Sequence, residues 1–243
     1  MRVRLKIQYD GRTYCGWQRQ KLEHNTIQEV LEDALFQVLN EKVILEASGR
    51  TDAGVSAYAQ IAHFDTDTEL PVERLPYMLK NVLPSTISVL EAEQVSQEFH
   101  SRFDVKKKTY MYKLYMNKLP LPLNWDRLQV KHLLDLNAMR EATKYFIGEH
   151  DFTSFTKKES LKDNCVRTIY DCYIEQNGND VDVYVTGSGF LHNMVRIIVG
   201  TIIAVGEGKI RPSDIDKIIK SKDRCTAYKT LPPYYLYMYN VEY

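Results

Sequence analysis

The stretch 168–186 sets the strongest limit on how the chain folds. Hydrophobic and polar residues alternate along it, and the dipeptide Asn177-Gly178 interrupts the alternation near the middle. Alternation with a period of two is typical of half-buried strands, and Asn-Gly tolerates the positive φ angles of a type I′ turn. We therefore predict a β-hairpin here, which requires antiparallel strands and argues against strict βαβ alternation.

The rest of the chain mixes the same strand pattern with helical spacing. Alternation predicts further strands over residues 3–9, 61–65, 87–90, 98–105, 109–117 and 234–243. Helical patterns predict helices over residues 27–38, 71–79, 137–146, 190–205 and 213–220. Asn25 and Gln28 resemble a capping box before the first helix. Together these elements predict an α+β fold with mainly antiparallel sheets.

The length of the chain fits two subdomains. Its 243 residues, 44% hydrophobic and 26% charged, have the composition of a folded globular protein. The two halves show a similar order of elements, so we expect α/β subdomains over residues 1–105 and 106–243, facing each other across a cleft. No apolar run reaches the roughly 18 residues of a membrane span, and the N-terminus alternates like a strand. We therefore expect a cytoplasmic protein without a membrane segment.

The formal net charge of zero hides an uneven distribution. Residues 1–105 carry 11 basic and 16 acidic side chains, whereas residues 106–243 carry 21 and 16. The excess of basic side chains in the second half begins in a segment that we call the basic strip. The cations of the basic strip are Arg102, Lys106, Lys107, Lys108, Lys113 and Lys118, and Tyr110, Tyr112 and Tyr115 lie between them. Interleaved cations and aromatic rings suit phosphate contacts combined with base stacking. A solvated strand with a tyrosine-rich face fits the same pattern.

The sequence lacks the usual signatures of metal and cofactor sites. The four cysteines show no CxxC spacing, and the histidines at 63, 100, 150 and 192 are not spaced as metal ligands. The GSG at 187–189 lacks the GxGxxG spacing of a dinucleotide site, and no P-loop or GxSxG motif occurs. We expect neither a metal nor a cofactor.

A short loop at 48–57 is the first candidate for chemistry. Glycines at 49 and 54 bracket Arg50, Thr51 and Asp52 between an apolar stretch and a predicted strand. A loop of small residues can present one carboxylate to a ligand. Asp52 can equally serve only to cap the neighbouring backbone.

Arg196 is the second candidate, because it is the one charged residue between positions 182 and 207. A buried arginine needs an anionic partner, since an unpaired interior charge is strongly unfavourable. The partner is either a structural acid or a functional carboxylate or phosphate. His192 lies four residues earlier and is expected on the same helical face.

Blocks spread over almost the whole chain resemble the tRNA pseudouridine synthase A (TruA) family. GRTDAGV at 49–55 is similar to its GRTDxGV signature, and YDG at 9–11, GWQ at 16–18 and TIQ at 26–28 are similar to its opening segments. FHSRF at 99–103, KTYMY at 108–112, GEHDF at 148–152 and GFLHNMVR at 189–196 resemble further blocks. Each block alone is modestly specific, and their order and spacing carry the resemblance.

The resemblance implies a pseudouridine synthase fold and an enzyme that isomerises uridine to pseudouridine. The family modifies positions 38, 39 and 40 of the tRNA anticodon stem-loop, binds tRNA as a homodimer, and uses no cofactor or metal. By position, Asp52 is the nucleophile, which attacks either C1′ of the ribose or C6 of the base. Tyr110 contacts the uracil and helps to move a proton. Arg196 pairs with Asp52 and keeps it ionised.

The resemblance also suggests which residues hold the RNA. Arg50 fills the space of the flipped nucleotide or binds its phosphate, because a stacked uridine hides its glycosidic bond. Four cations of the basic strip are expected to face the tRNA: Arg102, Lys106, Lys107 and Lys108.

The sequence departs from the family pattern at two places that bear on function. Ser56 stands where the family usually has histidine, and Tyr235 replaces a glycine in the segment 230–236. These changes leave open a paralogue that modifies a different RNA site. A catalytically silent RNA-binding or folding factor is a further alternative, which the presence of Asp52, Tyr110 and Arg196 argues against.

Overall fold

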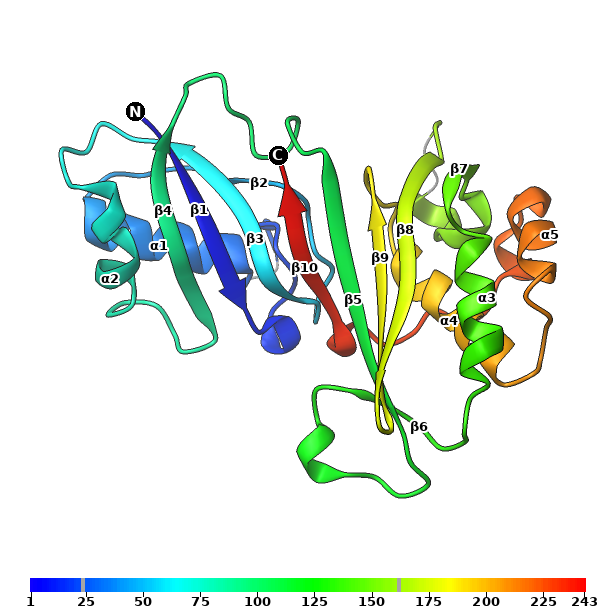
Figure 1. Cartoon of the computed structure of the whole chain (residues 1–243). Helices are drawn as coiled ribbons and strands as arrows, with labels where there is room; N and C mark the ends of the chain where they lie inside the picture. The colour runs from blue at the N-terminus through cyan, green and yellow to red at the C-terminus, as the bar shows by residue number, and fades with distance from the viewer. Residues whose placement is uncertain (23–24, 161–162) are drawn as a thin grey trace. The chain divides into compact units, whose positions relative to one another are not determined.

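The chain folds into two compact units, which are described separately. The structure, a computed structural model, describes residues 1–22, 25–160 and 163–243. One unit comprises Met1–Lys106 together with Tyr237–Tyr243, and the other comprises Lys107–Leu236. The sequence-based division at residue 105 placed the C-terminal strand in the second subdomain, whereas the structure pairs it with a strand of the first unit (Figure 1).

The first unit is built on a sheet with the strand order β4-β1-β3-β10. Its strands are β1 (Arg2–Tyr9), β2 (Glu46–Ala47), β3 (Ser56–Asp65), β4 (Ile87–Val95) and β10 (Leu236–Glu242). β1 pairs antiparallel with β3 and β4, β2 pairs antiparallel with β3, and β10 runs parallel to β3. Helices α1 (Ile27–Leu39) and α2 (Leu75–Leu79) cover one face (Figure 1). The alternate buried residues of β1 form the core on that sheet.

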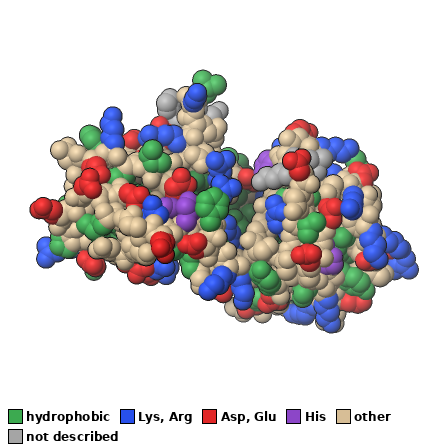
Figure 2. Space-filling model, turned by 90° about the horizontal axis from the view of Figure 1, so that it is seen from above, with side chains coloured by type: hydrophobic (Ala, Val, Ile, Leu, Met, Phe, Trp, Pro, Cys, Tyr) green, Lys and Arg blue, Asp and Glu red, His purple; other side chains and the backbone are tan. Residues whose placement is uncertain are grey.

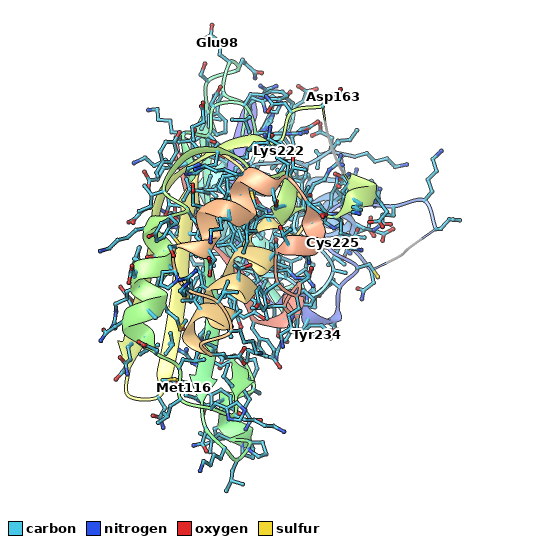
Figure 3. The ribbon with its side chains drawn as sticks, turned by 90° about the vertical axis from the view of Figure 1, so that its right-hand side faces the viewer. Glu98, Met116, Asp163, Lys222, Cys225 and Tyr234 are labelled. Carbon is cyan, nitrogen blue, oxygen red and sulfur yellow. The ribbon has the colours of Figure 1, made fainter. Side chains whose placement is uncertain are left out.

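The second unit repeats this plan with a meander of strands. β5 (Lys107–Met116), β7 (Gly148–Asp151), β8 (Val166–Asn177) and β9 (Asp180–Gly187) lie in the order β5-β9-β8-β7, all antiparallel, and β6 (Leu128–Val130) runs parallel to β5. Helices α3 (Leu136–Lys144), α4 (Met194–Gly206) and α5 (Asp214–Ser221) gather on one side of this sheet (Figures 1 and 3). The predicted α+β class with mainly antiparallel pairing is confirmed.

The sequence patterns misplace three local features. The helix cap is Thr26, whose Oγ1 accepts the Glu29 N–H at 3.3 Å, and not Asn25, whose own N–H instead donates to the Glu29 carboxylate. The hairpin loop is Gly178-Asn179, because Asn177 already pairs with Asp180. Only Gly178 of this pair has a positive φ, +60°, which fits a type II′ turn and not type I′.

The third difference is the predicted strand over 98–105, which forms a turn. The Asp104 N–H donates to the His100 carbonyl at 3.1 Å, and the Asp104 carboxylate accepts the His100 N–H at 2.7 Å. These two hydrogen bonds join residues four positions apart, so the backbone turns here and does not pair with a neighbouring strand. Across the residues that the structure describes, no helix is long and apolar enough to cross a membrane.

Candidate functional site

The loop that carries Asp52 comprises residues 48–55. Hydrogen bonds to β3 hold the beginning of this loop. The Ser48 N–H donates to the Ile61 carbonyl at 2.7 Å, and the Ser48 hydroxyl donates to Gln60 Oε1 at 2.7 Å. The amide of Gln60 then donates to the Gly49 carbonyl at 2.9 Å. Both Ser48 and Gln60 are fully buried, so the start of the Asp52 loop is fixed on the sheet.

The opening segment of the chain holds the middle of the Asp52 loop. The Trp17 N–H donates to the Thr51 carbonyl at 3.1 Å, and the Tyr9 hydroxyl bonds to Thr51 Oγ1 at 2.8 Å. The Gly54 N–H donates to the Tyr14 carbonyl at 3.3 Å. Burial raises the pKa of Tyr9 to about 12, so its hydroxyl is a neutral partner at ordinary pH. The blocks around residues 9–18 and 49–55 therefore form one structural assembly.

Two glycines explain why this assembly packs so closely. A Cβ at Gly11 would lie 1.9 Å from the Val55 carbonyl oxygen. Gly16 has φ +87°, and a Cβ there would lie 2.8 Å from the Thr51 carbonyl oxygen. In both cases the obstacle is the backbone of the Asp52 loop, which a side chain would displace.

Ser56, the first residue of β3, has a definite partner here. Its hydroxyl accepts the Gly11 N–H at 3.0 Å, and the side chain is buried. The serine therefore ties the end of the Asp52 loop to the turn after β1. Within the loop itself, the Val55 N–H donates to the Asp52 carbonyl at 3.1 Å. Asp52 is partly exposed and Arg50 is exposed.

Tyr110 of the second unit lies on β5 in a rigid setting. Its backbone pairs with Val185 of β9, and its ring packs edge-to-face with Phe190 at 5.1 Å between centroids. The residue is 9% exposed. A ring that is almost fully enclosed is held in one rotamer by its neighbours. The small part of the Tyr110 ring that remains exposed is therefore well placed to contact a ligand.

Arg196 is the one residue of α4 that is not buried. Its Nε donates to the Leu231 carbonyl at 2.6 Å, and Nη1 donates to Asn193 Oδ1 at 2.5 Å. A cation in the first turn of a helix opposes the helix dipole, so helix stability does not account for it. The predicted common face with His192 is wrong because α4 begins at Met194; His192 Nδ1 instead bonds to Ser160 Oγ.

The altered segment 230–236 is fastened inside the second unit. Besides the bond from Arg196 to Leu231, the Tyr112 hydroxyl donates to the Pro232 carbonyl at 2.9 Å. The ring of Tyr235 lies 6.4 Å from that of Tyr112, so Tyr235 adds an aromatic contact to this segment. Tyr234, labelled in Figure 3, is exposed.

Replacing Tyr112 with phenylalanine is expected to destabilise the protein by about 1 kcal/mol, since the half-buried Pro232 carbonyl loses its donor. Tyr112 is fully buried, and burial raises the pKa of its phenol, so no ionised form complicates the comparison. Urea unfolding followed by far-UV circular dichroism measures the change. Tyr234→Phe is the matched control, and equal midpoints for the two variants would show that the Tyr112 bond contributes nothing.

The basic strip divides into exposed and buried parts. Arg102, Lys106 and Lys107 are exposed and Lys108 is partly exposed, whereas Lys113 is 9% exposed and forms an ion pair with Asp126. The rings proposed to stack with bases are also enclosed: Tyr112 is 0% and Tyr115 is 4% exposed, and the Tyr115 hydroxyl accepts the Leu121 N–H. Stacking by Tyr112 and Tyr115 is therefore excluded, because both faces of β5 are covered.

The turn 99–104, whose FHSRF block and Arg102 the sequence had already pointed to, is anchored through Ser101 in a way that the sequence did not show. Ser101 is fully buried; its hydroxyl donates to the Glu46 carbonyl at 2.5 Å and its N–H donates to His63 Nδ1 at 3.2 Å. The hydroxyl of Tyr243 donates to the Ser101 carbonyl at 2.6 Å. The order of residues gives no sign of this anchoring, because the partners lie on β2, β3 and the C-terminus.

We expect stability to fall below about pH 6.5, in part through His63. Burial, then the charges of Arg2 and His100, lowers its pKa, while Glu46 and Asp65 act in the opposite direction. Below the ordinary pKa of about 6.5 the unfolded chain binds a proton that the folded His63 resists, so the free energy of unfolding decreases. Urea midpoints at pH 7.5 and 5.5 measure this. His63→Gln should reduce the difference and His132→Gln, at an exposed position, should not.

Among the described residues, the structure places the possible metal ligands apart from one another. Within ranges 1–22, 25–160 and 163–243, no group of three or more histidine, cysteine, aspartate or glutamate side chains lies close enough to hold an ion. None of the cysteines at 15, 165, 172 and 225, all within the described residues, forms a disulfide.

Comparison with known proteins identifies relatives along the whole chain. A family model described as tRNA pseudouridine synthase matches residues 6–104 and 142–243. The tRNA pseudouridine synthase A of Caldicellulosiruptor saccharolyticus is 45% identical over 242 residues, which are 99% of each chain. tRNA pseudouridine synthase A 2 of Clostridium tetani is 45% identical over 99% of this chain and 98% of that protein. tRNA pseudouridine synthase A of Ehrlichia canis is 40% identical over all of both.

Among solved structures the likeness is weaker. A chain in the crystal structure of the archaeal box H/ACA sRNP Nop10-Cbf5 complex has a TM-score of 0.37 and 14% identity, over 83% of this chain and 43% of that chain.

Proposed function

Because this chain belongs to the tRNA pseudouridine synthase family, we propose that it isomerises uridine to pseudouridine in tRNA with Asp52 as the nucleophile. The observation that carries the proposal is the Asp52 loop, whose backbone is held by β3 and by the opening segment of the chain. This support fixes the backbone on either side of a partly exposed carboxylate. A preorganised nucleophile needs no reorganisation at the moment of attack.

The reaction conserves every atom of the nucleotide except one exchanged hydrogen. The bond between C1′ and N1 breaks, the uracil rotates, and a bond forms between C1′ and C5. The proton on C5 passes to solvent and N1 gains a proton. A carboxylate serves as attacking group and then as leaving group, at C1′ or at C6. No oxidant, reductant or transferred group enters the balance, so the chemistry requires no cofactor.

We assign supporting roles to three further residues. Tyr110 would contact the uracil and assist in moving the C5 proton, for which its immobile ring is suited. Arg196 would keep Asp52 ionised, a role that explains a cation in the unfavourable first turn of α4. Arg50 would hold the flipped nucleotide in place, because its side chain is exposed next to Asp52.

The RNA substrate is proposed to be the anticodon stem-loop of tRNA, at positions 38, 39 and 40. The exposed cations Arg102, Lys106 and Lys107, with Lys108, would contact its phosphates, since folded RNA is recognised mainly through shape and backbone. The active species is proposed to be a homodimer that binds one tRNA across both subunits.

Mapping the product tests the target. Unmodified tRNA transcripts are incubated with the protein, and pseudouridine is located by chemical derivatisation and primer extension. The proposal expects product at 38, 39 and 40, and none in transcripts that carry cytidine there. Product at other positions would favour a paralogue with another RNA site. Binding of tRNA without any product would favour an RNA-binding or folding factor.

A further inference from the structure

The turn 99–104 is rigid although most of it is at the surface. Besides the bonds of Ser101 described above, the Arg2 guanidinium donates to the carbonyls of Gln97 and Phe99 at 2.7 and 2.9 Å. The Arg102 N–H donates to His100 Nδ1 at 3.1 Å. The turn is therefore fixed to the ends of β1, β3 and β10, and the side chains that it projects start from a defined backbone.

Phe103 projects from this rigid turn into solvent. It is 73% exposed, and its ring lies 4.2 Å from the His100 ring, tilted by 38°. The His100 ring in turn lies 4.8 Å from that of His63. Single exposed apolar residues are common on proteins, so exposure alone says little. The informative feature is that the His100 ring, which itself meets His63 edge-on, supports Phe103 from one side while most of the Phe103 surface stays accessible to another flat partner.

One cation lies beside this exposed ring and a second follows it closely in the sequence. The Arg102 guanidinium lies 5.8 Å from the Phe103 ring centroid, and exposed Lys106 follows three residues later. The nearby acid, Asp104, accepts the His100 N–H within the turn. The turn lies at the upper end of the view in Figure 1, and Figure 2, which looks onto that end, shows both Lys and Arg (blue) and Asp and Glu (red) side chains near a histidine (purple).

We propose that Phe103 is an RNA-binding residue that stacks on an unpaired base of the substrate, with Arg102 and Lys106 contacting the phosphates on either side. A supported aromatic ring beside cations is the arrangement that binds single-stranded nucleotides with little sequence preference. This assignment rests on the proposed function for the class of ligand. It replaces the stacking that the buried Tyr112 and Tyr115 cannot provide.

The test measures tRNA binding without turnover, in an Asp52→Ala background. Phe103→Ala should weaken the affinity for an unmodified tRNA transcript by about 5- to 150-fold, the range for loss of one stacked base. Phe103→Trp should retain the affinity, and Phe103→Leu, which keeps apolar surface but no π face, should not. Tyr77→Ala, at a 76% exposed tyrosine on α2, is the matched control and should bind as the parent does.

Salt dependence separates stacking from charge. Phe103→Ala should leave the slope of log affinity against log salt unchanged, whereas Arg102→Ala should reduce it by about one, since only a cation releases counterions. In the Phe103→Trp variant, binding of RNA should quench the fluorescence of the new tryptophan. The fluorescence of Trp17 and Trp125, measured in the parent protein, is subtracted first. Unfolding midpoints equal to that of the parent would exclude a folding defect.

Three results would overturn the assignment. Phe103→Ala would bind tRNA with the same affinity as the parent, or the slope of its log affinity against log salt would differ from that of the parent, or the substitution would alter only the self-association of the protein and not its affinity for tRNA. The proposed function fails separately. If the wild-type chain forms no pseudouridine but Phe103→Ala still weakens RNA binding, stacking stands and catalysis does not. If product forms and Phe103→Ala binds normally, only the stacking assignment is lost.

Discussion

Replacing Asp52 with alanine is expected to lower the rate of pseudouridine formation by about 10⁴-fold or more, because removing a nucleophile removes the covalent route itself. The affinity for tRNA should not fall, since a negative charge facing a polyanion is lost. Single-turnover rates and filter-binding affinities, measured on the same transcript, separate the two quantities.

Asp67→Ala is the control for this variant. Asp67 is exposed on the segment after β3 and takes no part in holding the Asp52 loop. The Asp67→Ala variant should form pseudouridine at the same rate as the wild type. A residual rate of Asp52→Ala within about tenfold of wild type, which corresponds to only 1.4 kcal/mol, would contradict the role of Asp52 as nucleophile.

Replacing Gly11 with alanine should have the second largest effect, on both stability and activity. The new Cβ would lie 1.9 Å from the Val55 carbonyl, and neither of the two backbones can turn aside like a flexible side chain. We expect a loss of about 3 kcal/mol from overpacking. Because Val55 is the end of the Asp52 loop, a displaced loop should also reduce kcat by about 100-fold in the protein that remains folded.

Gly189→Ala provides the matched comparison for stability. A Cβ at Gly189 meets no heavy atom within 4 Å, so the same substitution should change the urea midpoint little. Urea unfolding and kcat at saturating tRNA are the measurements. A Gly11→Ala protein with wild-type stability and kcat would show that the close contact between the opening segment and the Asp52 loop is not needed.

Local patterns in the sequence predicted most of the elements because each rests on neighbouring residues. The hairpin of β8 and β9 and the helix α1 follow from period-two and helical spacing. The turn at 99–104 could not be predicted in this way, because Ser101 is held by His63 and Tyr243, 38 and 142 residues distant. Long-range hydrogen bonds decide its conformation, and alternation of polarity does not record them.

The candidate site shows the same limit. The motif at 49–55 singles out Asp52, yet the sequence does not show that Tyr9, Gly11 and Trp17 hold its loop. These residues lie some forty positions earlier and meet the loop only because β1 pairs with β3. Likewise, Arg196 was expected to need an anion, and the structure adds neutral acceptors that the sequence did not show, among them the Leu231 carbonyl and Asn193 Oδ1.

Release of hydrogen from C5 of uridine tests the central claim most directly. A tRNA transcript labelled with tritium at C5 of its uridines loses label to water only when C5 forms the new bond to the ribose. With the wild-type protein alone, and with a chelator present, we predict tritium release equal in amount to the pseudouridine formed at 38, 39 and 40, and none with Asp52→Ala. Absence of release by the wild-type protein on a transcript that it binds would contradict the proposed function.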